Sequence, residues 1–213
     1  MVSKMTQLMM VIVIVSFLGF ITENIWTAFR FGTMDNRGMI MPGLLGYGIA
    51  MLLVYFILGT PDAPMFFGIS VRIENRILKR IYYVAMAAIF VSVGEILLGN
   101  LVEKMCHIEW WNYESLPMHI GKYTSVLTSL GFGLLISVFM DQLFPVLLGM
   151  TGYIKRKSTI QMMYFCLIGY VVDFFHEAKY MIRKKEINKR WTIDLHEKCL
   201  ITNKQVHSFR LKV

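Results

Sequence analysis

Ionisable side chains lie inside long apolar stretches of this sequence, and two of them share a regular spacing with a glycine. Glu95, Gly99 and Glu103 recur every four residues, so on a helix they lie on one face. A charged group at the centre of a bilayer costs about 2.5–3.5 kcal/mol on insertion scales, and it is usually kept where it faces protein or water. We therefore expect Glu95 and Glu103 to face polar partners within the protein.

A similar set occurs nearer the N-terminus. Gly19 and Glu23 are also four residues apart within an apolar run, and Asn36 and Arg37 follow in a short turn rich in turn-forming residues. A long basic side chain at this point can return to the helix bundle or extend to water. We expect Arg37 to reach a carboxylate, with Glu103 as the preferred partner and Glu23 as the second choice.

These groups admit two interpretations. A network of carboxylates with Arg37 can lock the helices together, or it can bind a substrate or a proton. The aromatic residues Trp110, Trp111 and Tyr113 follow Glu103 in a polar loop. Such rings are typical of the membrane–water boundary, so we interpret them as an interface anchor rather than a ligand platform.

The composition defines the class of protein in which these residues lie. Of 213 residues, 56% are hydrophobic and 17% are charged, and the mean hydropathy is +0.54. These values are too apolar for an ordinary soluble domain. The apolar runs are continuous and do not alternate, so we expect an all-α polytopic transmembrane helical bundle and not a barrel.

About five segments are apolar enough to be considered as membrane spans. The four expected spans and the fifth apolar segment lie near residues 8–29, 39–60, 81–102, 123–140 and 160–178. Residues 65–80 alternate apolar pairs with charged residues, which predicts an amphipathic helix on the membrane surface. We expect residues 1–154 to form the membrane core, and residues 155–213 to add the fifth segment and a basic tail.

Two features of this topology stay open. Residues 141–154, which contain Pro145, could extend the fourth span, re-enter the membrane or lie in the interface. Basic residues near the N-terminus, in residues 72–80 and in residues 155–157 predict a cytoplasmic N-terminus. Five crossings would then place the basic tail outside, against the same rule, so the side of the tail and the crossing of residues 160–178 are left open.

Several functions are disfavoured by the residue patterns. The net charge is +8, but no aromatic–basic recognition module accompanies it, so we expect no nucleic-acid partner. Cys106, His107 and His119 match no standard zinc spacing, and we expect neither a metal nor a cofactor. Asp173 and His176 are interpreted as a solvated helix end. No G-x-x-x-x-G-K-[ST] pattern occurs in the sequence, so a P-loop would have to come from another chain.

Four sequence blocks follow one another in a fixed order. They are G-F-I-T-E-N-I-W, N-R-G-M-I-M-P-G-L-L-G-Y-G, G-E-I-L-L-G-N-L-V-E-K and W-W-N-Y-E-S-L-P-M-H-I-G. Together they resemble the "putative type IV ABC-transporter" (CmpB-like) membrane family, and vertebrate transmembrane protein 229 is similar to the same pattern. The resemblance implies a helical membrane protein that resembles a permease-like transporter component.

The resemblance also implies which positions matter. The candidate polar network consists of Glu23, Asn36, Arg37, Tyr47, Glu95 and Glu103. The corresponding loop motif consists of Trp111, Asn112 and Tyr113. This chain departs from the family pattern in that loop, because Asn112 stands where Asp is usual and Glu114 where Ser is usual. Those departures argue against a role that needs an ionised Asp there.

Three functions follow as hypotheses. The first is a permease-like component of unknown substrate in the bacterial cell membrane, embedded in the lipid bilayer, with a separate ATPase chain and a homo-oligomer as expected partners. The second, although we lean against an enzyme, is an intramembrane enzyme acting on a lipid or lipid-linked substrate. It would use Glu23 or Glu95 as acid–base group and Arg37 on a phosphate or carboxylate. The third is a structural or regulatory partner of another membrane protein.

Overall fold

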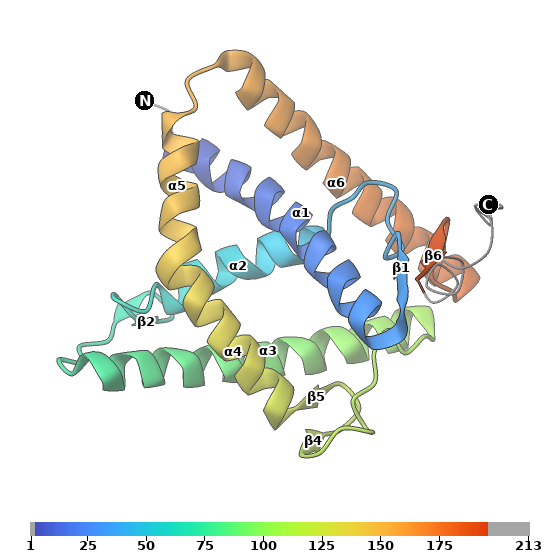
Figure 1. Ribbon diagram of the computed structural model, residues 1–213, viewed down its shortest axis with the longest axis horizontal. Coiled ribbons are helices and arrows are strands. Elements are labelled where there is room, and N and C mark those ends of the chain that lie inside the picture. The colour runs from blue at the N-terminus through green and yellow to red at the C-terminus, as the bar shows by residue number, and fades with distance from the viewer. Residues whose placement is uncertain (1–2, 196–213) are drawn as a thin grey trace, which may run out of the picture. The chain divides into compact units, whose positions relative to one another are not determined.

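Helices dominate the computed structural model, which describes residues 3–195. The helical elements are α1 (Lys4–Phe31), α2 (Leu45–Leu58), α3 (Arg76–Cys106), α4 (Val126–Val138), the π-helical turn η1 (Phe139–Leu143), α5 (Phe144–Tyr153) and α6 (Lys157–Lys184). The short strands are β1 (Thr33–Asp35), β2 (Met65–Phe66), β3 (Ile69–Ser70), β4 (His119–Ile120), β5 (Thr124–Ser125) and β6 (Thr192–Asp194). This arrangement confirms the prediction of an all-α polytopic helical protein (Figure 1).

Four of these helical segments are long and apolar enough to cross a membrane. They are α1, α3, the continuous run Val126–Tyr153 and α6. The helix α2 has 14 residues, which gives it a length of about 21 Å. A bilayer core is about 30 Å thick. The expected spans therefore correspond to four long helices and to the shorter apolar helix α2, which would need the residues next to it to reach across the core.

The fourth span continues beyond residue 140. The turn η1 joins α4 to α5 without a break in the helix, and Pro145 lies in the first turn of α5. A proline inside a helix removes one backbone hydrogen bond, and a local π-helical turn such as η1, which directly precedes Pro145, is a known adjustment to such an interruption. Of the three possibilities left open by the sequence, extension of the fourth span is the one that the structure adopts.

The prediction of an amphipathic surface helix over residues 65–80 is wrong. Residues 65–70 form the hairpin β2–β3, in which Phe67 (φ 49°) and Gly68 (φ 81°) form the two-residue turn. Two consecutive positive φ angles are typical of the tight turn that joins antiparallel strands. The basic residues from Arg76 onward belong to α3, whose N-terminus is capped by the side chain of Asn75. The glycine turn therefore divides a segment whose composition predicted one helix.

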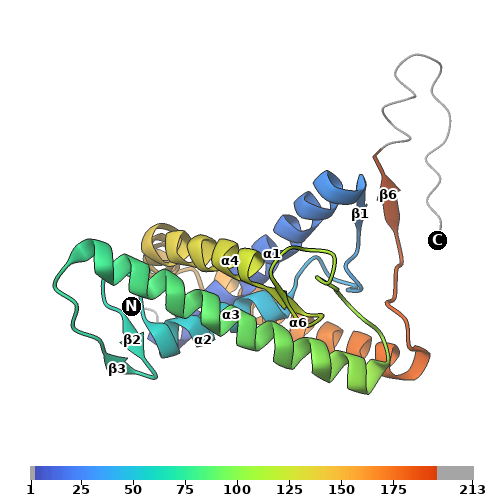
Figure 2. The same ribbon diagram turned by 90° about the horizontal axis from the view of Figure 1, so that it is seen from below.

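The described residues group into two units. Unit one comprises residues 3–8 and 49–155, and unit two comprises residues 9–48 and 156–195. In unit one, α3 and α4 lie side by side (Figure 2). Gly133 permits this approach, because a Cβ atom there would lie 2.7 Å from the carbonyl oxygen of Val84. Small residues at such contacts are the usual means by which membrane helices pack.

In unit two, β1 pairs with β6 in an antiparallel ribbon (Figure 1). Thr33 lies opposite Asp194, and Asp35 lies opposite Thr192. Directly paired strands must lie on the same side of a membrane. The segment that follows α6 therefore lies on the same side as the turn that follows α1.

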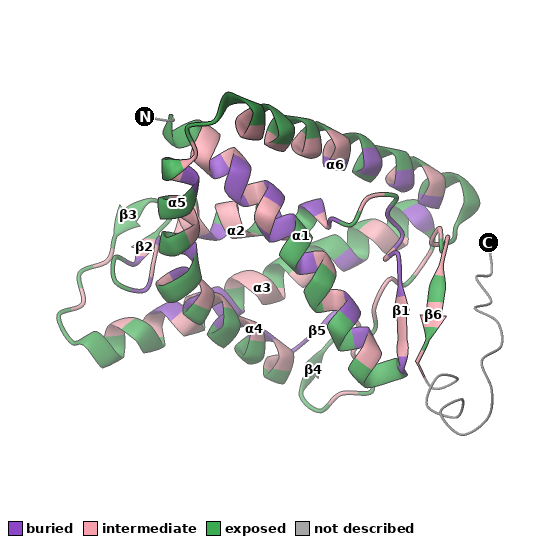
Figure 3. Cartoon of the chain, turned by 45° about the horizontal axis from the view of Figure 1, so that its top comes forward, coloured by how far each residue is buried: buried purple, intermediate pink, exposed green. Residues whose placement is uncertain are grey.

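The exposed side of α6 is strongly apolar. Phe165, Val172 and Phe175 are 74, 62 and 66% exposed, and the exposed residues follow one side of the helix (Figure 3). The buried residues of α6 include Tyr170, Asp173 and Glu177. A polar inner side and an apolar outer side are expected for a helix that faces lipid. In a membrane the outward positions contact hydrocarbon, and polar side chains are kept where they face protein.

Candidate functional site

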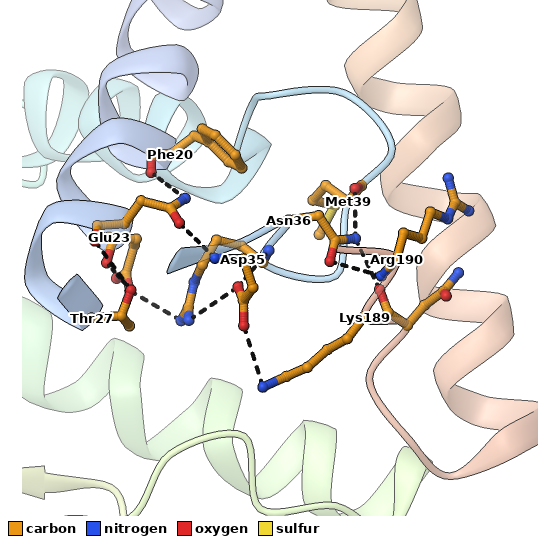
Figure 4. A network of polar contacts seen from close by, with 11 residues as sticks. Phe20, Glu23, Thr27, Asp35, Asn36, Met39, Lys189 and Arg190 are labelled. Carbon is orange, nitrogen blue, oxygen red and sulfur yellow. Dashed lines mark hydrogen bonds and ion pairs between the residues drawn. The ribbon is translucent and has the colours of Figure 1, made fainter. Parts of the chain in front are cut away.

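The first polar group lies in unit two, and we call it the turn cluster: Glu23, Asp35, Asn36, Arg37 and Tyr47. Arg37 Nη2 lies 3.2 Å from Glu23 Oε2, and the hydroxyl of Tyr47 donates to Glu23 Oε1. Figure 4 shows Glu23 on α1 beside the turn that carries Asp35 and Asn36. Glu23 is therefore held by a cation and by a phenol.

The spacing of Gly19 and Glu23 explains how α1 accepts these partners. A Cβ atom at Gly19 would lie 2.5 Å from the ring of Tyr47. The glycine thus leaves space for the aromatic ring against α1, one helical turn before Glu23. The predicted shared face of Gly19 and Glu23 is used to seat Tyr47 and to direct its hydroxyl to the carboxylate.

Asp35 organises the turn itself and is only 6% exposed. Its Oδ1 accepts the backbone N–H of Arg37 at 2.8 Å, and its own N–H donates to Asn24 Oδ1 at 2.9 Å. Its carboxylate also lies 3.6 Å from Arg37 Nη1 and 3.3 Å from Lys189 Nζ. An aspartate that accepts an N–H two residues further on is a common turn-forming device.

Asn36 links the turn to the segment after α6. It is 2% exposed, and its Nδ2 donates to the carbonyl oxygens of Met39 and Asn188, both at 2.9 Å. Its Oδ1 accepts the N–H of Arg190 at 3.1 Å (Figure 4). The side chain therefore satisfies backbone groups from two segments that are far apart in the sequence.

Two buried carboxylates of α6 complete this arrangement. Asp173 is 4% exposed and accepts the N–H groups of Ile40 and Met41 at 2.9 and 2.7 Å. Glu177 is 1% exposed and lies 2.6 Å from Arg190. The interpretation of Asp173 as part of a solvated helix end was wrong, because this face of α6 binds the turn.

A sequence signal for these residues existed. Asp173 and Glu177 are four residues apart in an apolar helix, the same spacing that drew attention to Glu95 and Glu103. His176 lies between them in the sequence, but its side chain is 57% exposed. The spacing could have predicted a polar face on α6, although not its partners.

Three carboxylates in this part of unit two are paired with cations, and a fourth, Asp173, is held by backbone N–H groups. The carboxylates Glu23, Asp35 and Glu177 face the cations Arg37, Lys189 and Arg190. A paired and hydrogen-bonded set of charges avoids the large cost of leaving one buried charge alone. This geometry favours a role in which the turn cluster fastens α1, the turn and the segment after α6.

The second polar group lies in unit one, and we call it the loop cluster: Glu95, Glu103, Glu109, Tyr113, Lys122, Tyr123 and Thr124. Glu103 accepts a hydrogen bond of 2.6 Å from Tyr123 Oη and one of 3.0 Å from Lys122 Nζ. The preferred pairing of Glu103 with Arg37 was therefore wrong, since Glu103 is held by Lys122 and Tyr123 and Arg37 is paired with Glu23. Lys122 lies in the loop that follows α3, and its side chain extends back to Glu103 near the end of that helix.

The loop groups outside the spanning segments have shifted pKa values. Hydrogen bonds from Lys122 and Asn112 lower the pKa of the Glu109 carboxyl. The hydrogen bonds of Lys122 to Glu109 and Glu103 raise the pKa of the ammonium group. Burial, with a smaller effect of the hydrogen bond to Glu103, raises the pKa of Tyr123 to about 12. All three groups therefore keep their ordinary charge states near neutral pH.

The loop folds back onto α3. Trp111 Nε1 donates to the carbonyl oxygen of Tyr123 at 2.9 Å, and the rings of Trp111 and Tyr123 meet edge to face at 5.9 Å. Gly99 faces the ring of Tyr123, which a Cβ atom there would overlap. Asn112 Oδ1 accepts the N–H of Glu114 at 2.7 Å and shapes the turn. The predicted open face at Gly99 is thus occupied by Tyr123.

Glu95 differs from the other carboxylates of these clusters. Its Oε2 accepts a hydrogen bond of 2.7 Å from Thr124, and its Oε1 lies 3.5 Å from Tyr113 Oη. Across residues 3–195, no basic side chain is within ion-pair distance of Glu95. The loop cluster therefore contains three carboxylates and one cation, Lys122, whereas both carboxylates of the turn cluster have a cation partner.

Comparison with known proteins adds one finding. The model of a family described as "Putative ABC-transporter type IV" matches residues 10–178. No curated protein matches the chain, and no solved structure matches it. The similarity to vertebrate transmembrane protein 229 therefore stays an expectation from the sequence blocks.

Proposed function

Because this chain belongs to the family described as "Putative ABC-transporter type IV", we propose that it is the permease-like membrane component of a transport system. The single observation that carries this proposal is the family match over residues 10–178, which includes all four long apolar helices except their outermost residues. ATP hydrolysis would belong to a separate chain, since the sequence contains no P-loop pattern.

The two clusters support different roles within such a component. The paired charges of the turn cluster fit a role that holds its segments in one arrangement. The loop cluster keeps an excess of carboxylates beside aromatic rings and is the better candidate for contact with transported material. Intramembrane ionisable groups commonly mark such pathways.

The alternative function, an enzyme acting on a lipid, is less well supported because the cation expected to bind its substrate is already paired. Arg37 was the residue expected to hold a phosphate or carboxylate of the substrate, but its guanidinium lies 3.2 Å from Glu23 and 3.6 Å from Asp35. A substrate anion would have to displace both carboxylates. This contact pattern supports the transport component over the enzyme.

The proposal includes a cellular arrangement. We place the chain in the bacterial cell membrane with a cytoplasmic N-terminus, and as a homo-oligomer, because one chain of this size encloses little space. The basic segment after α6 would then lie outside together with the turn. Two of its cations, Lys189 and Arg190, are paired with Asp35 and Glu177. Such pairing reduces the conflict with the usual cytoplasmic location of basic residues.

The test is co-purification of ATP hydrolysis. The tagged full-length chain is extracted from its native membrane in a mild detergent, and ATP hydrolysis is measured in the eluate with peptide identification of any P-loop chain. We expect a stoichiometric P-loop ATPase that is absent when an unrelated membrane protein carries the tag. A chain that purifies without an ATPase from gently solubilised membranes would contradict the proposal.

A further inference from the structure

A line of hydroxyl groups leads to Glu95 in unit one. Thr124 Oγ1 donates to Glu95 Oε2 at 2.7 Å, Ser129 Oγ lies 2.9 Å from Thr124 Oγ1, and Ser92 Oγ donates to Ser129 Oγ at 2.7 Å. Since Thr124 uses its hydrogen on Glu95, Ser129 must donate to Thr124. Every hydroxyl hydrogen in the line therefore points toward the carboxylate.

This line is shielded from the surroundings over most of its length. Thr124 is fully buried and Ser129 is 3% exposed, whereas Ser92 is partly exposed. Glu95 lies at the other end, where it meets Tyr113 of the loop. Ser92 and Glu95 are three residues apart on α3, so the two ends of the line lie about one helical turn apart, and the interior contains only hydroxyl groups.

We propose that Glu95, Thr124, Ser129 and Ser92 form a proton-binding site with a hydroxyl relay. Glu95 is a carboxylate within a candidate span, and no basic side chain of the described residues pairs with it. An uncompensated charge in apolar surroundings is costly, and uptake of a proton removes it. This assignment does not depend on an ATPase partner, because it rests on contacts within one unit of this chain.

The relay conserves atoms and charge. Ser92 takes up one proton at its exposed end and donates its own hydrogen to Ser129 Oγ. Ser129 donates its hydrogen to Thr124 Oγ1, Thr124 donates its own to Glu95 Oε2, and Glu95 releases a proton on the loop side. Each hydroxyl gains one O–H bond and loses one, so one proton moves in total, and rotation of the hydroxyls restores their direction.

The spacing of the oxygen atoms favours a proton over a metal ion. Separations of 2.7–2.9 Å are hydrogen-bond lengths. The hydroxyl groups form a line, whereas the oxygen ligands of a cation surround one point. Each oxygen in the line is already joined to the next by a hydrogen, so no set of lone pairs converges on a common centre.

The other titratable groups near Glu95 are few. On α3, Glu103 lies about two helical turns further on and is held by Lys122 and Tyr123. From the loop, Tyr113 faces Glu95 directly, and Glu109 contacts Lys122. The packed helix α4 contains no ionisable residue. A pH-dependent signal from the span can therefore be assigned with few variants.

The test measures protonation of Glu95 in the full-length chain, reconstituted in phosphatidylcholine–phosphatidylglycerol vesicles. Dicyclohexylcarbodiimide modifies protonated carboxyl groups in apolar surroundings, and peptide mass mapping locates the label. We expect label on Glu95 that is lost as the pH rises, and no label on Glu23, which is paired with Arg37. Glu95→Gln should abolish the label, while Glu103→Gln should retain it.

A second measurement needs no chemical modification. The infrared carbonyl band of a protonated carboxylic acid should appear on acidification of the wild-type chain and be lost in Glu95→Gln. Thr124→Val should shift the frequency of that band, because the hydrogen bond is removed, whereas Thr128→Val should not. Absence of both label and band in the folded wild type at every pH would overturn the proposal. Protection of Glu95 by Na⁺ at constant pH would overturn it in favour of a metal ion.

Discussion

Arg37 and Glu23 form an ion pair, with Arg37 Nη2 3.2 Å from Glu23 Oε2, that ties the turn after α1 back to α1 itself. Both side chains are about three-quarters covered, at 23 and 26% exposure. The same carboxylate also accepts the hydroxyl of Tyr47. The ion pair therefore holds the turn against α1 and leaves Arg37 unavailable to a substrate.

Thermal stability should reveal coupling between Arg37 and Glu23. Arg37→Met leaves the Glu23 carboxylate without its cation, which should cost about 1–3 kcal/mol in the free energy of unfolding. The double variant Arg37→Met/Glu23→Gln should lose less than the sum of the two single variants, because neither charge is left alone. The unfolding temperature in detergent is measured for the wild type, the two single variants and the double variant.

Glu103→Gln provides the matched control. Combined with Arg37→Met, it should give an additive loss of stability, since Glu103 is bound by Lys122 and Tyr123. Non-additivity in this second pair, together with additivity in the first, would show that the assigned partners are wrong.

Asp173 should be more important for stability than its sequence neighbour His176. Asp173→Ala leaves the buried N–H groups of Ile40 and Met41 without an acceptor, which should cost about 1–3 kcal/mol. His176→Ala removes a side chain that is 57% exposed and should leave the unfolding temperature nearly unchanged. Equal effects of the two substitutions would be inconsistent with the placement of Asp173 against the turn.

Two glycines of α4 offer a matched pair for helix packing. A Cβ atom at Gly133 would lie 2.7 Å from the carbonyl oxygen of Val84, whereas one at Gly131 would meet nothing within 4 Å. Gly133→Ala should therefore destabilise the protein by about 1–3 kcal/mol. Gly131→Ala should change stability by less than about 1 kcal/mol. Unfolding in mixed micelles compares them, and a larger loss at Gly131 would refute the contact.

The phenol of Tyr123 should ionise at a higher pH than an unperturbed tyrosine. Burial raises its pKa from 10.0 to about 12, with a smaller effect of the hydrogen bond to Glu103. Between these two pH values the unfolded chain releases a proton that the folded chain retains, so the free energy of unfolding should fall as the pH rises. The difference in phenolate absorbance between wild type and Tyr123→Phe measures the pKa.

Glu103→Gln gives a further check on that assignment. Removing the carboxylate should lower the pKa of Tyr123 while leaving it above 10.0, because burial is the larger cause. An ordinary value for Tyr123 in the wild type would show that the ring is not packed against Gly99.

The membrane architecture followed from the sequence because continuous apolar runs have few alternative structures. The spans near residues 81–102 and 160–178 correspond to α3 and α6. The prediction of a surface helix was wrong because a turn with positive φ angles at Phe67 and Gly68 reverses the chain. Composition carries little information about such a turn. Likewise, Pro145 left residues 141–154 open, because the residue pattern does not reveal the π-helical turn that precedes the proline in the continuous helix.

The candidate residues were found more reliably than their partners. Spacing drew attention to Glu23, Glu95 and Glu103, and each makes polar contacts in the structure. The pairing of Arg37 could not be predicted, because two carboxylates at similar depths satisfy the same rule. Asp173 was misread because its partners are backbone N–H groups, which leave no trace in the pattern of side chains.

The most direct test of the central claim is a comparison of solutes in sealed inverted membrane vesicles from cells with and without this chain. Untargeted mass spectrometry, with and without ATP, shows which solutes accumulate inside. We predict at least one solute that accumulates only when both ATP and the chain are present, and whose accumulation is reduced by Gly133→Ala but not by Gly131→Ala. Identical solute profiles with and without the chain, at normal levels of the ATPase partner, would contradict its assignment as a transport component.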